Sequence, residues 1–175
     1  LDTIFCGELP GTAAGRILEN VQPVGGTEKA EAIREIAGFL DVPLGEVMYV
    51  GDSITDVEAF RSVRASGGLT VSFNGNSYAV RDAEIGVLSD TAFVTLVLAR
   101  IFADRGRVGV LEVAEKWPEE LSEVVESQMS EYLFAAHLSA FPRVVVIKPD
   151  NLETTVKEST FFRKTVRGEM IGRLG

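Results

Sequence analysis

Cysteine and histidine are almost absent from this chain. Cys6 and His137 are the single examples of each in 175 residues. One cysteine excludes an intrachain disulfide and a thiolate-rich metal site. A catalytic Cys–His pair is disfavoured, since the two residues lie far apart and His137 falls in a helical pattern. We therefore expect the chemistry to depend on other residue types.

Long apolar runs and an excess of basic residues are also missing. No apolar run reaches the roughly 18–20 residues that a transmembrane helix needs. The first residues lack the basic-then-apolar pattern of a signal peptide. Lysine and arginine number 17 against 26 acidic residues, so the net charge is −9. This disfavours nucleic acid as the main partner, because phosphate binding needs a basic surface. The composition fits a cytoplasmic protein with no membrane partner.

The apolar content of 46% and the chain length are sufficient for one domain with a core of its own. Residues 1–25 are rich in turn formers and are interpreted as a remnant of an upstream or cap region. The chain starts at Leu1 in the middle of a pattern, from which we expect a fragment of a longer protein.

Residues 26–104 alternate between helical and strand patterns, which predicts βαβ units and a parallel sheet. Thr27 is predicted to cap the first of these helices. The expected helices cover 28–40, 55–63, 77–82 and 91–104, and the expected strands cover 47–50, 69–73 and 85–88. The fold class is therefore α/β, with part of a Rossmann-like core.

Residues 105–175 are predicted to form a mostly helical C-terminal extension with one strong strand at 143–148. Its expected helices are 108–117, 119–139 and 151–172. The acidic helix 119–139 could dock a partner, although an ordinary amphipathic packing helix is the simpler interpretation.

The most informative motif is Gly51-Asp52-Ser53-Ile54-Thr55-Asp56, which follows the apolar strand 47–50. The strand delivers Asp52 to its carboxyl end, where ligands bind in open α/β sheets. Asp56 lies one helical turn further on, so both carboxylates could face one small volume and bind Mg²⁺. The alternative is a capped helix, with Asp52 or Ser53 as N-cap and Asp56 stabilising the first turn.

Lys29 stands near the start of the helix expected at 28–40. A lysine there opposes the helix dipole, so it is locally unfavourable and a candidate for function. The alternative is a solvated surface lysine, the commonest fate of that residue type.

The order of these features resembles the second half of the haloacid dehalogenase superfamily of aspartate-dependent phosphohydrolases. Gly26-Thr27-Glu28-Lys29-Ala30 is similar to its lysine motif, and Gly51–Asp56 to its metal motif. Gly75-Asn76-Ser77 is similar to the rim of the active site in the sugar-phosphatase branch. The resemblance covers roughly residues 25–103.

This resemblance implies roles for five residues. Asp52 would hold Mg²⁺ directly or through water, and Asp56 would bind the metal or orient its ligands. Lys29 would neutralise the substrate phosphate, while Ser53 and Asn76 would lie at the phosphate site or its rim. The reaction would be phosphoryl transfer to an aspartate followed by hydrolysis, on a small phosphorylated metabolite.

The nucleophile of that family, an Asp-x-Asp motif on a strand preceding the lysine, is not present in the sequence. We therefore predict that this chain alone is inactive and that its missing N-terminal half or a partner chain supplies the nucleophile. A sheet without its central strand exposes an edge. The C-terminal segment, a partner chain or a second copy in a homo-oligomer would cover it.

Two other interpretations remain open. The chain could be a non-catalytic scaffold or a regulatory subunit that retains the fold. It could also be a flavodoxin-like domain of the response-regulator type, although the lysine precedes the acids here, which is the reverse of the order usual in that fold.

Overall fold

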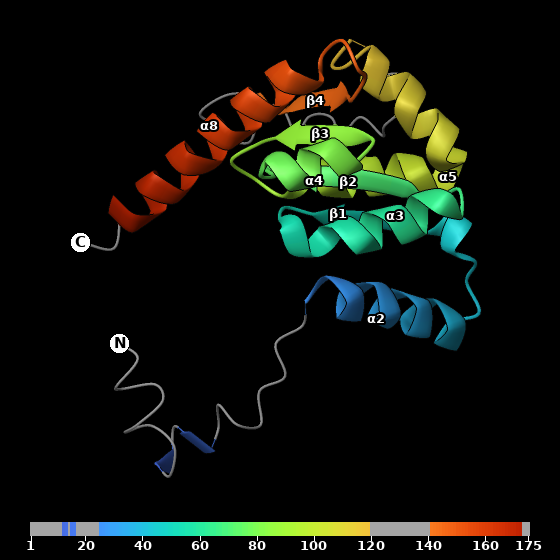
Figure 1. Cartoon of the computed structure of the whole chain (residues 1–175). Helices are drawn as coiled ribbons and strands as arrows, with labels where there is room; N and C mark the ends of the chain where they lie inside the picture. Colours follow the sequence, from blue (N-terminus) through green and yellow to red (C-terminus); the bar gives the residue numbers. More distant parts are fainter. Residues whose placement is uncertain (1–11, 14, 17–24, 120–140, 173–175) are drawn as a thin grey trace.

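The computed structural model describes residues 12–13, 15–16, 25–119 and 141–172 (Figure 1). Its centre is a four-stranded sheet in the order β1-β2-β3-β4. β1, β2 and β3 run parallel, and β4 is antiparallel to β3. The predicted α/β class with a mostly parallel sheet is confirmed. The strands are β1 (Met48–Gly51), β2 (Leu69–Phe73), β3 (Ile85–Leu88) and β4 (Arg143–Val146).

The helices of the described residues follow the expected pattern with two differences. The first helix begins at Gly26 with Gly25 as its N-cap, so the prediction of Thr27 as the cap was wrong. The expected helices 91–104 and 108–117 are joined as one element that is kinked at Gly106, where φ is +64°. The helices are α2 (Gly26–Phe39), η2 (Leu44–Glu46), η3 (Ile54–Asp56), α3 (Val57–Ala65), α4 (Ser77–Asp82), α5 (Phe93–Glu115) and α8 (Leu152–Gly172).

The sheet lies between two helical layers. Alternate side chains of the strands, such as Val71 and Ile85, pack with α5 residues in a fully buried apolar cluster. The opposite face packs against α3, α4 and α8. In Figure 1, α2 lies at the β1 side of the molecule, whereas β4 and α8 lie at the β3 side. Burial on both faces fits the apolar sequence of β3, whereas β2 carries the buried polar residues Thr70 and Ser72 at alternate positions.

The two edges of the sheet differ. β4 lies at the edge beyond β3, whereas β1 has no neighbour on its outer side among the described residues. All four residues of β1 are half-buried, and those of β3 are fully buried. Of the three coverings proposed for this edge, the described part of the C-terminal segment is therefore not the one. Its strand extends the sheet on the opposite side, where β3 offers free backbone groups.

The expected boundary after residue 104 falls inside α5, next to Gly106. Beyond this point the chain returns to the same sheet through β4, and α8 packs against α4 and β3. The part of the C-terminal extension that the structure describes is thus built onto the core. The expected helix 119–139 lies outside the described residues, as do Cys6, His137 and nearly all of residues 1–25.

Candidate functional site

The predicted motif leaves the sheet at the carboxyl end of β1. Gly51 is the last residue of the strand, and the chain then turns through η3 into α3. A Cβ atom on Gly51 would lie 2.6 Å from both Cβ and Cγ of Asp56. Glycine is therefore required here for close approach, so that the Asp56 side chain can fold back under the turn.

Asp56 accepts hydrogen bonds from five donors. Its Oδ2 atom accepts from the backbone N–H of Asp52 at 3.0 Å, and from the backbone N–H and hydroxyl of Ser53, each at 2.9 Å. Its Oδ1 atom accepts from the Lys29 ammonium at 2.7 Å and from the Tyr49 hydroxyl at 2.9 Å. A carboxylate offers about four lone-pair positions, so these donors occupy it fully.

The electrostatics of this cluster favour one protonation state. Burial alone would raise the pKa of Asp56, but the hydrogen bonds from Lys29, the Asp52 backbone, Tyr49 and Ser53 outweigh it and lower the pKa to about 2. Burial, with the adjacent Asp56 carboxylate, raises the pKa of Tyr49 well above its ordinary value. At neutral pH Asp56 is thus an anion and Tyr49 a neutral donor.

Asp56 holds the turn together instead of projecting into an open site. Its side chain is only 4% exposed. It draws the amide groups of the turn, Lys29 of α2 and Tyr49 of β1 onto one carboxylate. The capping alternative weighed from the sequence therefore describes the geometry of Asp56 well.

Lys29 reaches the motif, as the spacing indicated. Besides Asp56, its ammonium group contacts the Thr55 hydroxyl at 2.9 Å, and its side chain is 30% exposed. The solvated-lysine alternative is therefore wrong. Lys29 neutralises a buried acid of the turn, and this pairing explains why a lysine is tolerated near the start of α2.

Asp52 lies differently from Asp56. Its side chain is 45% exposed, and its Oδ2 atom is 2.6 Å from Nη1 of Arg163 in α8. The same nitrogen donates to the backbone carbonyl oxygens of Asp52 at 2.6 Å and Asn74 at 3.1 Å. The structure brings Asp52 and Asp56 to the same turn, but their carboxylates bind different cations.

Asn76 lies beside this site in a structural role. Its side-chain oxygen accepts from the N–H groups of Tyr78 and Ala79, which makes it the N-cap of α4. Its own N–H donates to the carbonyl of Asp52 at 2.9 Å. Asn76 thus ties the loop after β2 to the loop after β1.

The described residues only partly suit a Mg²⁺ ion. They contain no group of three or more aspartate, glutamate, histidine or cysteine residues that could hold a metal. Asp56 is saturated by donors, and Asp52 already pairs with a guanidinium group. Mg²⁺ binding at Asp52 would require Arg163 to leave and the remaining oxygen ligands to be supplied by water or by groups outside these residues.

Arg163 and Tyr49 are the site residues that sequence reasoning missed. A signal for Arg163 exists in the polar series Thr155, Ser159 and Arg163, which recurs every four residues along one face of α8. Thr155 and Ser159 are buried, and the Ser159 hydroxyl donates to the carbonyl of Gly75 at 2.8 Å. Tyr49 gave no signal apart from its place in an apolar strand.

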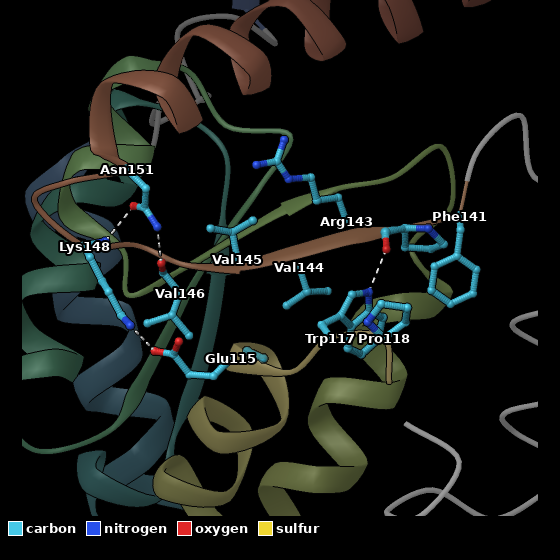
Figure 2. A pocket seen from close by; sticks show the side chains of 12 residues that line it. Glu115, Trp117, Pro118, Phe141, Arg143, Val144, Val145, Val146, Lys148 and Asn151 are labelled. Atoms are coloured by element: carbon cyan, nitrogen blue, oxygen red, sulfur yellow. Dashed lines mark hydrogen bonds and ion pairs between the residues drawn. The ribbon is translucent and has the colours of Figure 1, made fainter. Parts of the chain in front are cut away.

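A pocket of about 460 Å³ lies elsewhere, between the end of α5 and β4 (Figure 2). Trp117 and Phe141 supply its aromatic wall, and the Trp117 indole donates to the carbonyl of Pro142 at 2.7 Å. Its charged groups are already paired, with Lys148 2.6 Å from Glu115. It contains none of the predicted site residues.

Comparisons with known proteins identify a fold relative only. No protein-family model matches this chain, and no curated protein sequence matches it. The structure of gene product AF1437 from Archaeoglobus fulgidus is similar, with a TM-score of 0.61 and 25% identity. The match covers 92% of this chain but spans only 44% of that one. No helix among the described residues is long and apolar enough to cross a membrane.

Proposed function

We propose that this chain carries the lysine-and-acid half of a phosphatase of the haloacid dehalogenase type. The substrate would be a small phosphorylated metabolite and the setting the cytoplasm, as the sequence resemblance and composition imply. One observation carries the proposal. Lys29 and the Gly51–Asp56 turn, separated by more than twenty residues, meet at the carboxyl end of a parallel strand. This is where ligands bind in open α/β sheets.

The outer edge of β1 has no neighbour within the part of the chain that the structure describes, which supports a site completed by another segment. β1 ends in Gly51, and the carboxyl end of any strand added in parallel beside β1 would lie next to Asp52. An aspartate at the end of that strand could serve as the nucleophile that this chain lacks, and as a second oxygen donor for Mg²⁺. The added strand would come from a missing N-terminal half, a partner chain or a second copy.

Each residue of the site would have its own role in that chemistry. Mg²⁺, when bound, would stabilise charge on the transferring phosphoryl oxygens. Asp52 would hold the metal, and Asp56 would orient Lys29 and the amide groups of the turn. The Lys29 ammonium would present a hydrogen-bond donor to the substrate phosphate, and Ser53 would lie at the rim of that phosphate site.

A phosphatase assay should distinguish this chain from the complete enzyme. We would assay 4-nitrophenyl phosphate and a panel of sugar phosphates with Mg²⁺, using the 175-residue chain and any longer product of the same gene. We expect the longer product to be active, its Asp52→Asn variant to be inactive, and the chain alone to be inactive. The matched control is Asp150→Asn, a change far from the turn. Full activity of the Asp52→Asn variant would exclude this assignment.

A second candidate is a non-catalytic scaffold or regulatory subunit. It is favoured by the full occupancy of Asp56 and by the guanidinium group on Asp52. Under this alternative, millimolar Mg²⁺ leaves the melting temperature of the longer product unchanged. A rise in melting temperature that Asp52→Asn removes would favour the phosphatase.

A further inference from the structure

We infer that Arg163 is a built-in cation at this site, and that a divalent metal binds Asp52 only after Arg163 has left. One nitrogen of its guanidinium group contacts three oxygen atoms: Asp52 Oδ2, the Asp52 carbonyl and the Asn74 carbonyl. The oxygens come from the loops after β1 and β2, beside the Gly51–Asp56 turn. The inference concerns the site of the proposed function but does not depend on phosphatase activity.

These three oxygens form a cradle suited to cations. One is a carboxylate oxygen and two are backbone carbonyl oxygens, which are the hard donors that Mg²⁺, Ca²⁺ and Mn²⁺ prefer. Each Arg163 contact is at most 3.1 Å long. A metal ion bound to the same oxygens would stand within a few ångströms of the guanidinium group, and like charges at that distance repel strongly. The two cations therefore exclude one another.

The packing of α8 holds Arg163 in this place. One turn before it, Ser159 is buried and donates to the Gly75 carbonyl at 2.8 Å. Two turns before it, Thr155 is buried against the sheet. Arg163 itself is only 15% exposed. Its alkyl stem is thus packed in the structure, and its charge is delivered to Asp52 without an external ligand.

Under this inference, α8 controls whether a metal ion can bind Asp52. With Arg163 in place, Asp52 is neutralised and metal binding is weak. When the last turns of α8 move away, the same oxygens become a metal site. Metal binding and the docking of α8 are then linked: each cation lowers the binding affinity of the other by the same factor.

The test is Mn²⁺ binding, followed by electron paramagnetic resonance of the free ion. The proteins are the wild-type chain, Arg163→Gln, Arg163→Gln with Asp52→Asn, and Lys164→Gln as a control on an exposed neighbour in α8. We expect Arg163→Gln to bind Mn²⁺ about tenfold or more tightly than wild type, as the removal of a competing charge implies. The double variant and Lys164→Gln should behave like wild type.

Folding is monitored by far-ultraviolet circular dichroism. If Arg163→Gln does not fold, Ser159→Ala takes its place, because it loosens α8 without altering the three oxygens. Its Mn²⁺ affinity should rise about twofold to fivefold, an increase that Asp52→Asn abolishes. Equal Mn²⁺ affinity in wild type and the loosened variants, or a gain that survives Asp52→Asn, would overturn the inference.

The experiments distinguish a failure of the inference about Arg163 from a failure of the proposed phosphatase function. An active longer product whose Asp52 binds Mn²⁺ equally well with and without Arg163 would overturn the inference and leave the phosphatase standing. A gain of Mn²⁺ binding in Arg163→Gln together with an inactive longer product would do the reverse.

Discussion

Two buried carboxylates, at opposite ends of the strands, differ in how many hydrogen-bond donors surround them. Asp56, at the carboxyl end of β1, accepts from five donors. Glu84, at the amino end of β3, is 6% exposed and pairs through Oε1 with Arg107. Its other oxygen, Oε2, is buried and has no hydrogen-bond partner in the described part of the chain.

The difference follows from what surrounds each acid. The turn after β1 presents backbone N–H groups to Asp56 in addition to side chains. Glu84 instead meets Arg107, which directly follows the kink in α5 at Gly106. Ligands bind at the carboxyl ends of parallel strands. The fully satisfied acid therefore organises a candidate site, whereas the partly satisfied one fixes a helix to the sheet.

Replacing each acid by its amide tests this comparison most strongly. Asp56→Asn removes the negative charge that neutralises Lys29 and turns an amide donor toward other donors, so we expect a loss of about 3–5 kcal/mol in the free energy of unfolding. Glu84→Gln keeps an acceptor for Arg107 and should cost only about 1–2 kcal/mol. Urea unfolding at pH 7 measures both. Equal losses would mean that the number of donors does not distinguish the two acids.

The pH dependence of stability tests the same comparison through the pKa of Asp56. Its pKa of about 2 in the folded chain lies below the usual 3.8. The resulting stability is present above about pH 4 and is lost as the pH falls toward 2, with a total of roughly 2 kcal/mol. The difference in unfolding free energy between wild type and Asp56→Asn, followed from pH 5 to pH 2, should therefore shrink. A constant difference would contradict the lowered pKa.

Two glycines of the sheet test whether the Asp56 turn is as tightly packed as its hydrogen bonds imply. In Gly51→Ala the new methyl group would meet Asp56 atoms at 2.6 Å, so we expect a loss of about 1–3 kcal/mol. In the control, Gly86→Ala, the nearest atom is the Thr155 methyl carbon at 3.1 Å. Thermal melting should show the smaller decrease for Gly86→Ala, and the reverse order would disprove close packing at the turn.

The smallest effect is expected from removing one of the five donors. Tyr49→Phe should destabilise the chain by about 1 kcal/mol in urea unfolding, the typical value of one hydrogen bond. Because the pKa of Tyr49 is raised, its phenol should also stay protonated when other tyrosines ionise. Ultraviolet absorbance between pH 9 and pH 12 would detect this. A smaller absorbance change in Tyr49→Phe than in wild type over this pH range would instead show that Tyr49 ionises normally.

Much of the fold could be predicted from short-range patterns. The strands at 69–73 and 85–88 and the helix at 77–82 agree with the structure residue for residue. These elements are short apolar runs or capped turns, whose conformation depends on neighbouring residues. The predicted helix cap at Thr27 was wrong because Gly25, in an extended conformation, ends the preceding loop two residues earlier than expected.

The candidate site could be predicted only in part. The meeting of Lys29 with the Gly51–Asp56 turn was expected from the order of the two motifs, which resembles that of the haloacid dehalogenase superfamily. The approach of Arg163 to Asp52 was not, because the two residues are 111 positions apart. Whether Mg²⁺ uses Asp52 and whether Lys29 contacts a phosphate remain predictions.

The sequence by itself determined the α/β class, most of the strands and helices, and the position of the acidic turn after a buried strand. Those features depend on hydrophobic period and on local turn chemistry, which neighbouring residues encode. Only the tertiary structure decided that Asp56 is enclosed by donors while Asp52 faces a guanidinium group, and that β1 has no outer neighbour among the described residues. The contact of Asp52 with Arg163 and the place of β4 beside β3 depend on the path of α8 and β4 across the sheet, which long-range packing selects and no local pattern records.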